Sequence, residues 1–264
     1  MRNALLMLVA VMMLGAAPSA DTAKQVLKDS PRHGEWIDVP LKDSETKIHT
    51  WVVYPERKEK APVVIVIHEI FGMTDWVRSV ADQLAAEGYI AIAPDLLSGK
   101  GPKGGGTEEL GDKVGDAIRK LSKDEVVQRL DSVRDYALAL PAANGKSASI
   151  GFCWGGGASF NYATRQPKLN AAIVYYGSPP DKDALAKIEC PVLGLYGGDD
   201  ARITQTVEPT AATMKELNKS YEPHIYDGAG HGFLRQQTGR GGANEKAAKE
   251  AWPTTIEFLK KNLP

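Results

Sequence analysis

One segment in the middle of the chain places a cysteine among glycines at the junction between a predicted strand and a predicted helix. It reads Gly-Phe-Cys-Trp-Gly-Gly-Gly over residues 151–157, after the apolar run 148–150 and before the helix-compatible residues 158–162. A side chain at the centre of so sharp a turn needs neighbours two positions away that lack a Cβ atom, and glycine meets that need. The pattern predicts that Cys153 presents its thiol beyond the carboxyl end of a strand, where a nucleophile would lie.

Strand-like and helix-like segments alternate along the rest of the chain, which favours an α/β fold with a mainly parallel central sheet and helices on both faces. The expected strands cover residues 35–40, 47–54, 63–67, 89–93, 147–151, 171–176, 192–196 and 222–226. The longer expected helices cover 77–85, 126–140 and 206–218, and a last one reaches residue 263. The first two strands alternate apolar and polar residues and are expected to pair antiparallel. Neither an internal repeat nor a Pro/Ser-rich linker divides the chain, so we expect one domain over residues 21–264.

Residues 1–20 have the pattern of a secretory signal peptide. Arg2 precedes an apolar run over residues 4–14, and small residues with one proline follow as far as Ala20. We expect cleavage near residues 19 and 20, followed by export to a bacterial periplasm or to the medium. The apolar run is too short to span a bilayer unaided, so no stable membrane anchor is expected after cleavage. An uncleaved anchor is the alternative.

The overall composition is that of an ordinary globular protein that does not bind nucleic acid. Hydrophobic residues make up 43% of the chain, charged residues make up 25%, and the net charge is −1, which leaves no excess of positive charge for a nucleic acid. Cys190 lies just before the strand 192–196, whereas Cys153 follows the end of its own strand. About 20 Å would separate these two levels of the sheet, which is too far for a disulfide. No cluster of His, Cys or carboxylates has metal-ligand spacing, so we expect neither a metal nor a cofactor.

An acid and a base follow the cysteine in the order that an α/β-hydrolase fold requires. Asp200 comes shortly after the strand 192–196, and His231 lies in a glycine-rich loop after the last strand. A thiol attacks as a thiolate, so it needs a base such as His231 within reach, and that imidazole needs an orienting carboxylate. Asp200 is the expected acid, with Asp199 as the alternative.

Two backbone amides are the expected donors to an oxyanion in such a site. The N–H of Trp154 lies at the start of the helix after the cysteine, and the N–H of Ile70 lies in the loop after the strand 63–67. Each donor of this kind lowers the barrier of acyl transfer by about 3–4 kcal/mol.

Four segments, in this order, resemble the dienelactone hydrolase family; they are residues 68–72, 151–156, 197–200 and 229–235. The resemblance implies that Glu69 contacts the thiol in the resting enzyme. It also implies that Glu69 turns toward an arginine when substrate binds, which releases the thiol to His231. Arg235 corresponds to an arginine that binds a substrate carboxylate in this family; an arginine on a solvated loop is the alternative. Tyr176 is expected either to wall the substrate pocket or to pack in the core.

Together these residues predict a hydrolase that cleaves small carboxylic esters or lactones through a Cys-His-Asp triad and a thioester acyl-enzyme. A broad esterase that also accepts aryl or phosphate esters is the nearest alternative, because the insertion 98–106 stands where the family has a second arginine and a tyrosine. This glycine- and lysine-rich insertion is expected to be a mobile surface loop or a lid over the site. A hydrolase-shaped binding protein without chemistry is the alternative from another class.

Overall fold

The centre of the molecule is an eight-stranded sheet in which β3 to β8 run parallel. The computed structural model describes residues 19–264, so the expected signal peptide lies outside the described residues except for Ser19 and Ala20. The strands lie in the order β1-β2-β4-β3-β5-β6-β7-β8, and β2 pairs antiparallel with both β1 and β4. The predicted sheet and its antiparallel lead-in are confirmed. The strands are β1 (Gly34–Pro40), β2 (Lys47–Val53), β3 (Ala61–Ile67), β4 (Ile90–Pro94), β5 (Ala143–Phe152), β6 (Ala171–Tyr175), β7 (Val192–Gly197) and β8 (Tyr221–Tyr226).

The side chains of β3 alternate between two separate cores, one on each face of the sheet. Val64 and Val66 pack into one core, and Val63, Ile65 and Ile67 pack into the other. Successive side chains of a strand point to opposite faces, so a central strand covered on both sides needs a continuous apolar sequence. Full burial of each such side chain contributes about 1.5–3 kcal/mol, which makes this strand a rigid support for the loop that follows it.

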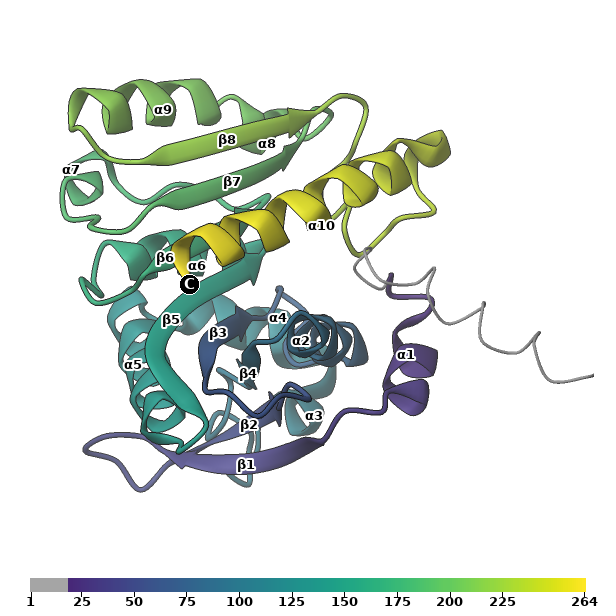
Figure 1. Cartoon of the computed structure of the whole chain (residues 1–264), viewed down its shortest axis with the longest axis vertical. Coiled ribbons are helices and arrows are strands. Elements are labelled where there is room, and N and C mark those ends of the chain that lie inside the picture. The colour runs from purple at the N-terminus through teal and green to yellow at the C-terminus, as the bar shows by residue number, and fades with distance from the viewer. Residues whose placement is uncertain (1–18) are drawn as a thin grey trace, which may run out of the picture.

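Helices cover both faces, as the sequence predicts. The core that contains Val64 lies under α2 (Asp75–Ala86) and α10 (Ala243–Asn262), and α1 (Ala23–Asp29) packs against α2. The core that contains Ile65 lies under α5 (Lys123–Ala139), α6 (Trp154–Ala163) and α9 (Val207–Glu216). Figure 1 shows α10 lying over one face of the sheet and α9 beside β8 at one edge of the sheet.

Several short elements were not predicted, because an apolar period cannot be recognised over so few residues. The helix α1 is one of them, and its Ala23 is buried in the core beside α2. The others are α3 (Thr107–Leu110), η1 (Gly111–Lys113), α4 (Val114–Lys120), α7 (Lys182–Leu185), α8 (Ala201–Thr204) and η2 (Arg240–Gly242).

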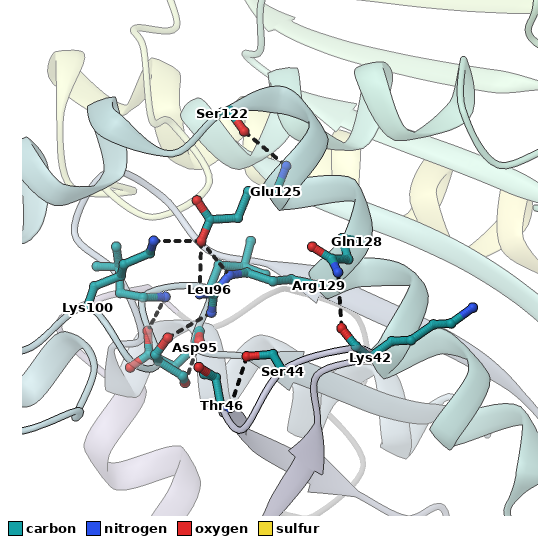
Figure 2. Close-up of polar contacts among 12 residues, drawn as sticks. Lys42, Ser44, Thr46, Asp95, Leu96, Lys100, Ser122, Glu125, Gln128 and Arg129 are labelled. Atoms are coloured by element: carbon teal, nitrogen blue, oxygen red, sulfur yellow. Dashed lines mark hydrogen bonds and ion pairs between the residues drawn. The ribbon is translucent and has the colours of Figure 1, made fainter.

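The insertion 98–106 is a folded loop that two carboxylates hold in place through hydrogen bonds and an ion pair. Glu109 accepts hydrogen bonds from the amides of Lys103 and Gly105, at 2.7 and 2.6 Å. Lys100 and Arg129 converge on Glu125 of α5, at 2.7 and 3.0 Å (Figure 2). The loop lines a cavity of about 820 Å³ whose lining includes neither Cys153 nor the expected acid and base. The structure therefore does not place the insertion over the cysteine as a lid.

Both cysteines are free, as expected from their levels in the sheet. Within residues 19–264, no helix has the length and apolar character needed to cross a membrane.

Candidate active site

Cys153 occupies a backbone conformation that ordinary residues avoid, at the turn between β5 and α6. Its φ is +55° and its ψ is −116°, a combination disfavoured for a side chain with a Cβ atom. The strained residue is held on both sides, because its N–H donates to the carbonyl oxygen of Tyr175 at 3.0 Å and its own carbonyl accepts from Gly157 at 3.2 Å. Strain that is stabilised in this way is typical of functional sites.

Two glycines allow the turn to be this tight. A Cβ atom on Gly151 would lie 1.9 Å from the carbonyl oxygen of Gly155. A Cβ atom on Gly155 would lie 2.3 Å from the carbonyl oxygen of His68 and 2.4 Å from that of Ile67. Glycine at position 155 therefore lets the first turn of α6 approach the carboxyl end of β3, which brings the cysteine and the loop after β3 together.

The structure brings Asp200 and His231 together from segments 31 residues apart. Asp200 directly precedes α8 in the turn after β7, and His231 lies in the loop after β8. The Nδ1 atom of His231 lies 2.5 Å from Oδ2 of Asp200, whose side chain is 8% exposed. With Nδ1 bonded to the carboxylate, Nε2 is the ring nitrogen left to exchange a proton. The alternative acid, Asp199, instead pairs with Arg240 at 3.1 Å on an exposed surface.

The thiol of Cys153 rests against two backbone amides. Burial raises the pKa of Cys153 and the charge of Glu69 raises it further, whereas hydrogen bonds from the amides of Trp154 and Ile70 lower it. These are the two amides expected to bind an oxyanion. Within the described part of the chain, no hydrogen bond joins this thiol to His231.

Glu69 is paired with Arg235 in this structure. Its Oε2 lies 2.6 Å from Nε of Arg235, and the guanidinium lies over the ring of Phe71, 4.7 Å from its centroid. Burial raises the pKa of Glu69 to about 7, although the charge of Arg235 acts to lower it. The resemblance implied that Glu69 contacts the resting thiol and meets an arginine only after substrate binds. Here the carboxylate already has its arginine, because a buried carboxylate needs a partner of opposite charge.

A cavity of about 540 Å³ opens beside the thiol. Ile70, Trp154 and Tyr176 line it together with Cys153. Tyr176 is fully buried, and its ring meets the His231 ring edge-on at a centroid distance of 5.1 Å. The structure buries Tyr176 in the core and also places it in the wall of this cavity.

The cationic side chains that line this cavity do not include Arg235, which the sequence predicted to bind the substrate. Arg119, Lys123 and Arg202 line it, whereas Arg235 lines a separate hollow beside Phe71. Arg119 pairs with a carboxylate on its own helix, and Lys123 pairs with one on the loop before α7. Among residues 19–264, no carboxylate lies within 4.0 Å of the Arg202 guanidinium, and the charge of this arginine lowers the pKa of Cys153.

Arg202 was not predicted as a site residue from the sequence, although its position offered one signal. It lies two residues after the expected acid, at the start of a short helix above the carboxyl end of β7. Side chains at the carboxyl ends of parallel strands converge on one edge of the sheet, where α/β proteins bind ligands.

Comparison with known proteins agrees with this architecture. The sequence pattern of the dienelactone hydrolase family matches residues 48–263. The chain belongs to the dienelactone hydrolase family. Its relatives include a protein of Salmonella typhimurium provisionally named carboxymethylenebutenolidase, 35% identical over 213 residues that cover 75% of this chain and 76% of the relative. A protein of Saccharolobus solfataricus with the same provisional name is 31% identical, over 81% of this chain and 94% of its own.

Solved structures show the same fold. A protein of Klebsiella pneumoniae, provisionally described as a dienelactone hydrolase, superposes with a TM-score of 0.76 at 28% identity, over 87% of this chain and 98% of its own. A dienelactone hydrolase-like promiscuous phosphotriesterase from metagenomic libraries superposes with a TM-score of 0.73 at 21% identity, over 88% and 99% of the two chains. The predicted family and α/β-hydrolase fold are thus confirmed, and this member of the family is a dienelactone hydrolase-like hydrolase.

Proposed function

We propose that this protein hydrolyses carboxylic esters or lactones, with Cys153 as nucleophile, His231 as general base and acid, and Asp200 as the orienting carboxylate. The observation that most supports this is the 2.5 Å contact between Nδ1 of His231 and Asp200, in a site that also holds a cysteine on a strained turn. A histidine oriented in this way by a carboxylate is the arrangement that activates a nucleophile.

The first half of the reaction forms a thioester. Nε2 of His231 takes the thiol proton, the thiolate attacks the carbonyl carbon, and the π electrons of the carbonyl move onto its oxygen. The amides of Ile70 and Trp154 then bind this oxyanion in the place that the resting thiol vacates. When the carbon–oxygen double bond re-forms, the alkoxide departs and takes the proton from His231, which leaves Cys153 acylated.

The second half consumes one water molecule. His231 takes a proton from the water as its oxygen attacks the thioester carbon, and the same two amides hold the new oxyanion. Collapse breaks the carbon–sulfur bond, the acid leaves, and the sulfur recovers its proton from His231. For a lactone, the alcohol and the acid remain one molecule, and no fragment departs in the first half.

The raised pKa of the resting thiol fits a site that is activated only when substrate is present. Burial and the Glu69 charge keep the sulfur protonated, and a protonated thiol resists alkylation and oxidation. Substrate entering the cavity competes for the two amides, which turns the sulfur toward His231.

The charge around the cavity favours an anionic substrate. Arg202 has no carboxylate partner in the described part of the chain and acts electrostatically on the thiol, so it is available to a carboxylate on the substrate. Arg235 is committed to Glu69 and lines a different hollow. We therefore assign substrate-carboxylate binding to Arg202 ahead of Arg235.

The test of the proposed function uses p-nitrophenyl esters and intact-protein mass spectrometry. The parent enzyme is expected to turn over the ester and to gain the mass of one acyl group when it is quenched during turnover. Cys153→Ala should lose both signals, while Cys190→Ala, at a buried cysteine, keeps both. Ester turnover by the Cys153→Ala variant at the parent rate would rule out the proposed mechanism.

Two other functions make different predictions in the same experiment. A broad esterase would also cleave a p-nitrophenyl phosphate triester, an activity that the printed name of one structural relative describes for that protein. A binding protein without chemistry would show no turnover, and its Cys153 would react with iodoacetamide no faster than an exposed free cysteine.

We also propose that the chain is exported and cleaved near residues 19 and 20. Ala23 is buried against α2, and the amide of Ala20 donates to the carbonyl oxygen of Arg235 at 3.0 Å, so the fold needs the chain from about this point onward. Amino-terminal sequencing of the protein from a bacterial periplasm is expected to begin at residue 20 or 21. A sequence that begins at residue 1 would contradict this proposal.

A further inference from the structure

A fully buried histidine next to the site has no part in the steps above. His68 follows β3 directly and is 0% exposed. Its Nδ1 atom lies 2.8 Å from the carbonyl oxygen of Glu69, and its Nε2 atom accepts from the amide of Leu96 at 3.3 Å. A backbone N–H can only donate, so Nε2 carries no proton, and Nδ1–H is the donor to Glu69. Both ring nitrogens are therefore used, and one neutral tautomer is specified.

The Glu69 carbonyl, which accepts from His68 at 2.8 Å and also from the amide of Gly72 at 3.1 Å, belongs to the peptide unit that carries the Ile70 amide. The atoms of a trans peptide are coplanar, and its C=O and N–H point in opposite directions. No cis peptide occurs among residues 19–264. A hydrogen bond that fixes the Glu69 carbonyl on one side therefore fixes the Ile70 N–H on the other side, and that N–H points to the sulfur of Cys153.

The same histidine contacts the residue that supplies the second amide. Its ring stacks on the indole of Trp154, with centroids 5.5 Å apart and planes 18° apart. Gly155 brings the first turn of α6 against the carbonyl oxygen of His68. One side chain thus bridges the loop after β3 and the start of α6, which are the two segments that form the expected oxyanion hole.

The other hydrogen bond of His68 anchors the ring to a rigid part of the fold. Leu96 lies just after β4, in the loop whose Asp95 accepts from the amide of Leu97 at 3.0 Å. Farther along, that loop is held to α5 through Lys100 and Glu125 (Figure 2). The ring is therefore fixed from the side opposite to Glu69.

We propose that His68 is a positioning residue, which orients the Ile70 amide toward the developing oxyanion and sets its spacing from the Trp154 amide. The inference rests on the proposed ester hydrolysis and adds to it a residue that touches neither substrate nor nucleophile. Burial holds the pKa of His68 below its ordinary value despite the nearby charge of Asp95, so the ring remains the neutral donor that this role requires.

A matched pair of substitutions separates the hydrogen bond from the bulk of the ring. Asn and Leu have the same branched shape, but only Asn carries a donor where Nδ1 of His68 lies. We expect His68→Leu to lower kcat for a p-nitrophenyl ester by about 10- to 100-fold with little change in KM, because a displaced oxyanion donor acts on the transition state. His68→Asn is expected to stay within about threefold of the parent kcat.

Turnover of a thionoester distinguishes the loss of an oxyanion donor from a general disturbance of the structure around His68. Its C=S sulfur accepts hydrogen bonds weakly, so turnover of the thionoester depends little on the two amides. We expect the ester-to-thionoester ratio of kcat to fall in His68→Leu by about as much as the ester kcat falls, and to be retained in His68→Asn. If His68→Leu does not fold, His68→Phe takes its place, because Phe fills the ring space and keeps the stacking on Trp154 without a donor.

Two outcomes would overturn the inference. One is a His68→Leu variant with the parent kcat and the parent ester-to-thionoester ratio. The other is a His68→Asn variant that is as slow as the Leu variant, because the loss would then come from packing. Either result leaves the proposed function standing, provided that the parent hydrolyses the ester and Cys153→Ala does not. Ester turnover by Cys153→Ala would defeat the proposed function itself.

Discussion

Nε of Arg235 lies 2.6 Å from Oε2 of Glu69, and the carboxylate side chain of this pair is only 4% exposed. The contact joins the loop after β3 to the loop that carries His231, so the two loops meet beside the thiol. The contact also gives Arg235, which the sequence predicted to bind the substrate, a partner within the protein. The ionisation of Glu69 therefore bears on both the stability and the reactivity of the site.

The stability of the fold should decrease as the Glu69 carboxyl ionises. Its pKa is about 7 in the folded protein, against the ordinary value of 4.5 expected for the unfolded chain, so between these values the folded state binds more protons than the unfolded state. This contribution is fully present below the lower pKa and is lost as the pH rises through the higher one, with a total of about 3 kcal/mol. The free energy of unfolding, measured with urea, should change less with pH in Glu69→Gln than in the parent between about pH 4 and pH 8. Parallel curves for the two proteins would argue against this assignment.

The same substitution should make the thiol easier to ionise. Burial raises the pKa of Cys153 first and the Glu69 charge adds to it, so Glu69→Gln removes one of the two causes. The rate of iodoacetamide alkylation measured against pH should then reach its midpoint at a lower pH than in the parent. Cys190 does not interfere, because burial raises its pKa to about 12. A midpoint that stays in place or moves upward would show that Glu69 does not act on the thiol in this way.

Asp200→Asn should cost far more activity than Asp199→Asn. The first change removes the carboxylate that holds Nδ1–H of His231, which allows the wrong tautomer, and the corresponding loss in serine proteases is about 10⁴-fold in kcat. The second change breaks only an exposed pair with Arg240, which is worth about 0–1 kcal/mol of stability. Steady-state kcat of both variants with one ester decides the matter. Similar losses in the two would mean that the acid is wrongly assigned.

Gly155→Ala should destabilise the fold, whereas Gly157→Ala should not. A Cβ atom at position 155 would lie 2.3 Å from the carbonyl oxygen of His68, which is backbone and cannot turn aside. Overpacking of this kind costs about 1–3 kcal/mol. At position 157 the nearest atom, the carbonyl oxygen of Ser178, would be 3.4 Å away, and Ala is about 1 kcal/mol better than Gly within a helix. Thermal melting of the two variants gives the comparison, and equal midpoints would contradict it.

Arg202→Ala should weaken binding of anionic esters selectively. We expect KM to rise by about 10-fold for a p-nitrophenyl ester that carries a carboxylate, and to change little for its neutral analogue, because a charge-assisted hydrogen bond contributes about 1.5–3 kcal/mol. Arg165→Ala serves as the control, since this arginine pairs with Asp124 on the surface and does not line the cavity. Equal effects on the charged and neutral esters would remove Arg202 from substrate recognition.

Local signals were sufficient to predict the sheet and the order of the site residues. The continuous apolar run of β3 predicts a strand buried on both faces because strand geometry alternates side chains at every residue. The glycines around Cys153 predict the sharp turn because close backbone approach excludes a Cβ atom. Helices of four to seven residues, such as α1, α4 and α8, escaped prediction because their apolar period is too short to recognise.

The amino-acid sequence by itself indicated the parallel sheet and placed a cysteine, an acid and a histidine in hydrolase order, since these depend on periodicity and turn chemistry within short segments. The resemblance of four of its segments indicated the family. Only the tertiary structure decided that Glu69 pairs with Arg235 and that Arg202 lines the cavity. It alone also showed that both nitrogens of the His68 ring are bonded. The Glu69–Arg235 pair and the bond from Leu96 to His68 join residues distant in sequence, and the partner of a buried polar group is set by which groups the fold brings within hydrogen-bond distance.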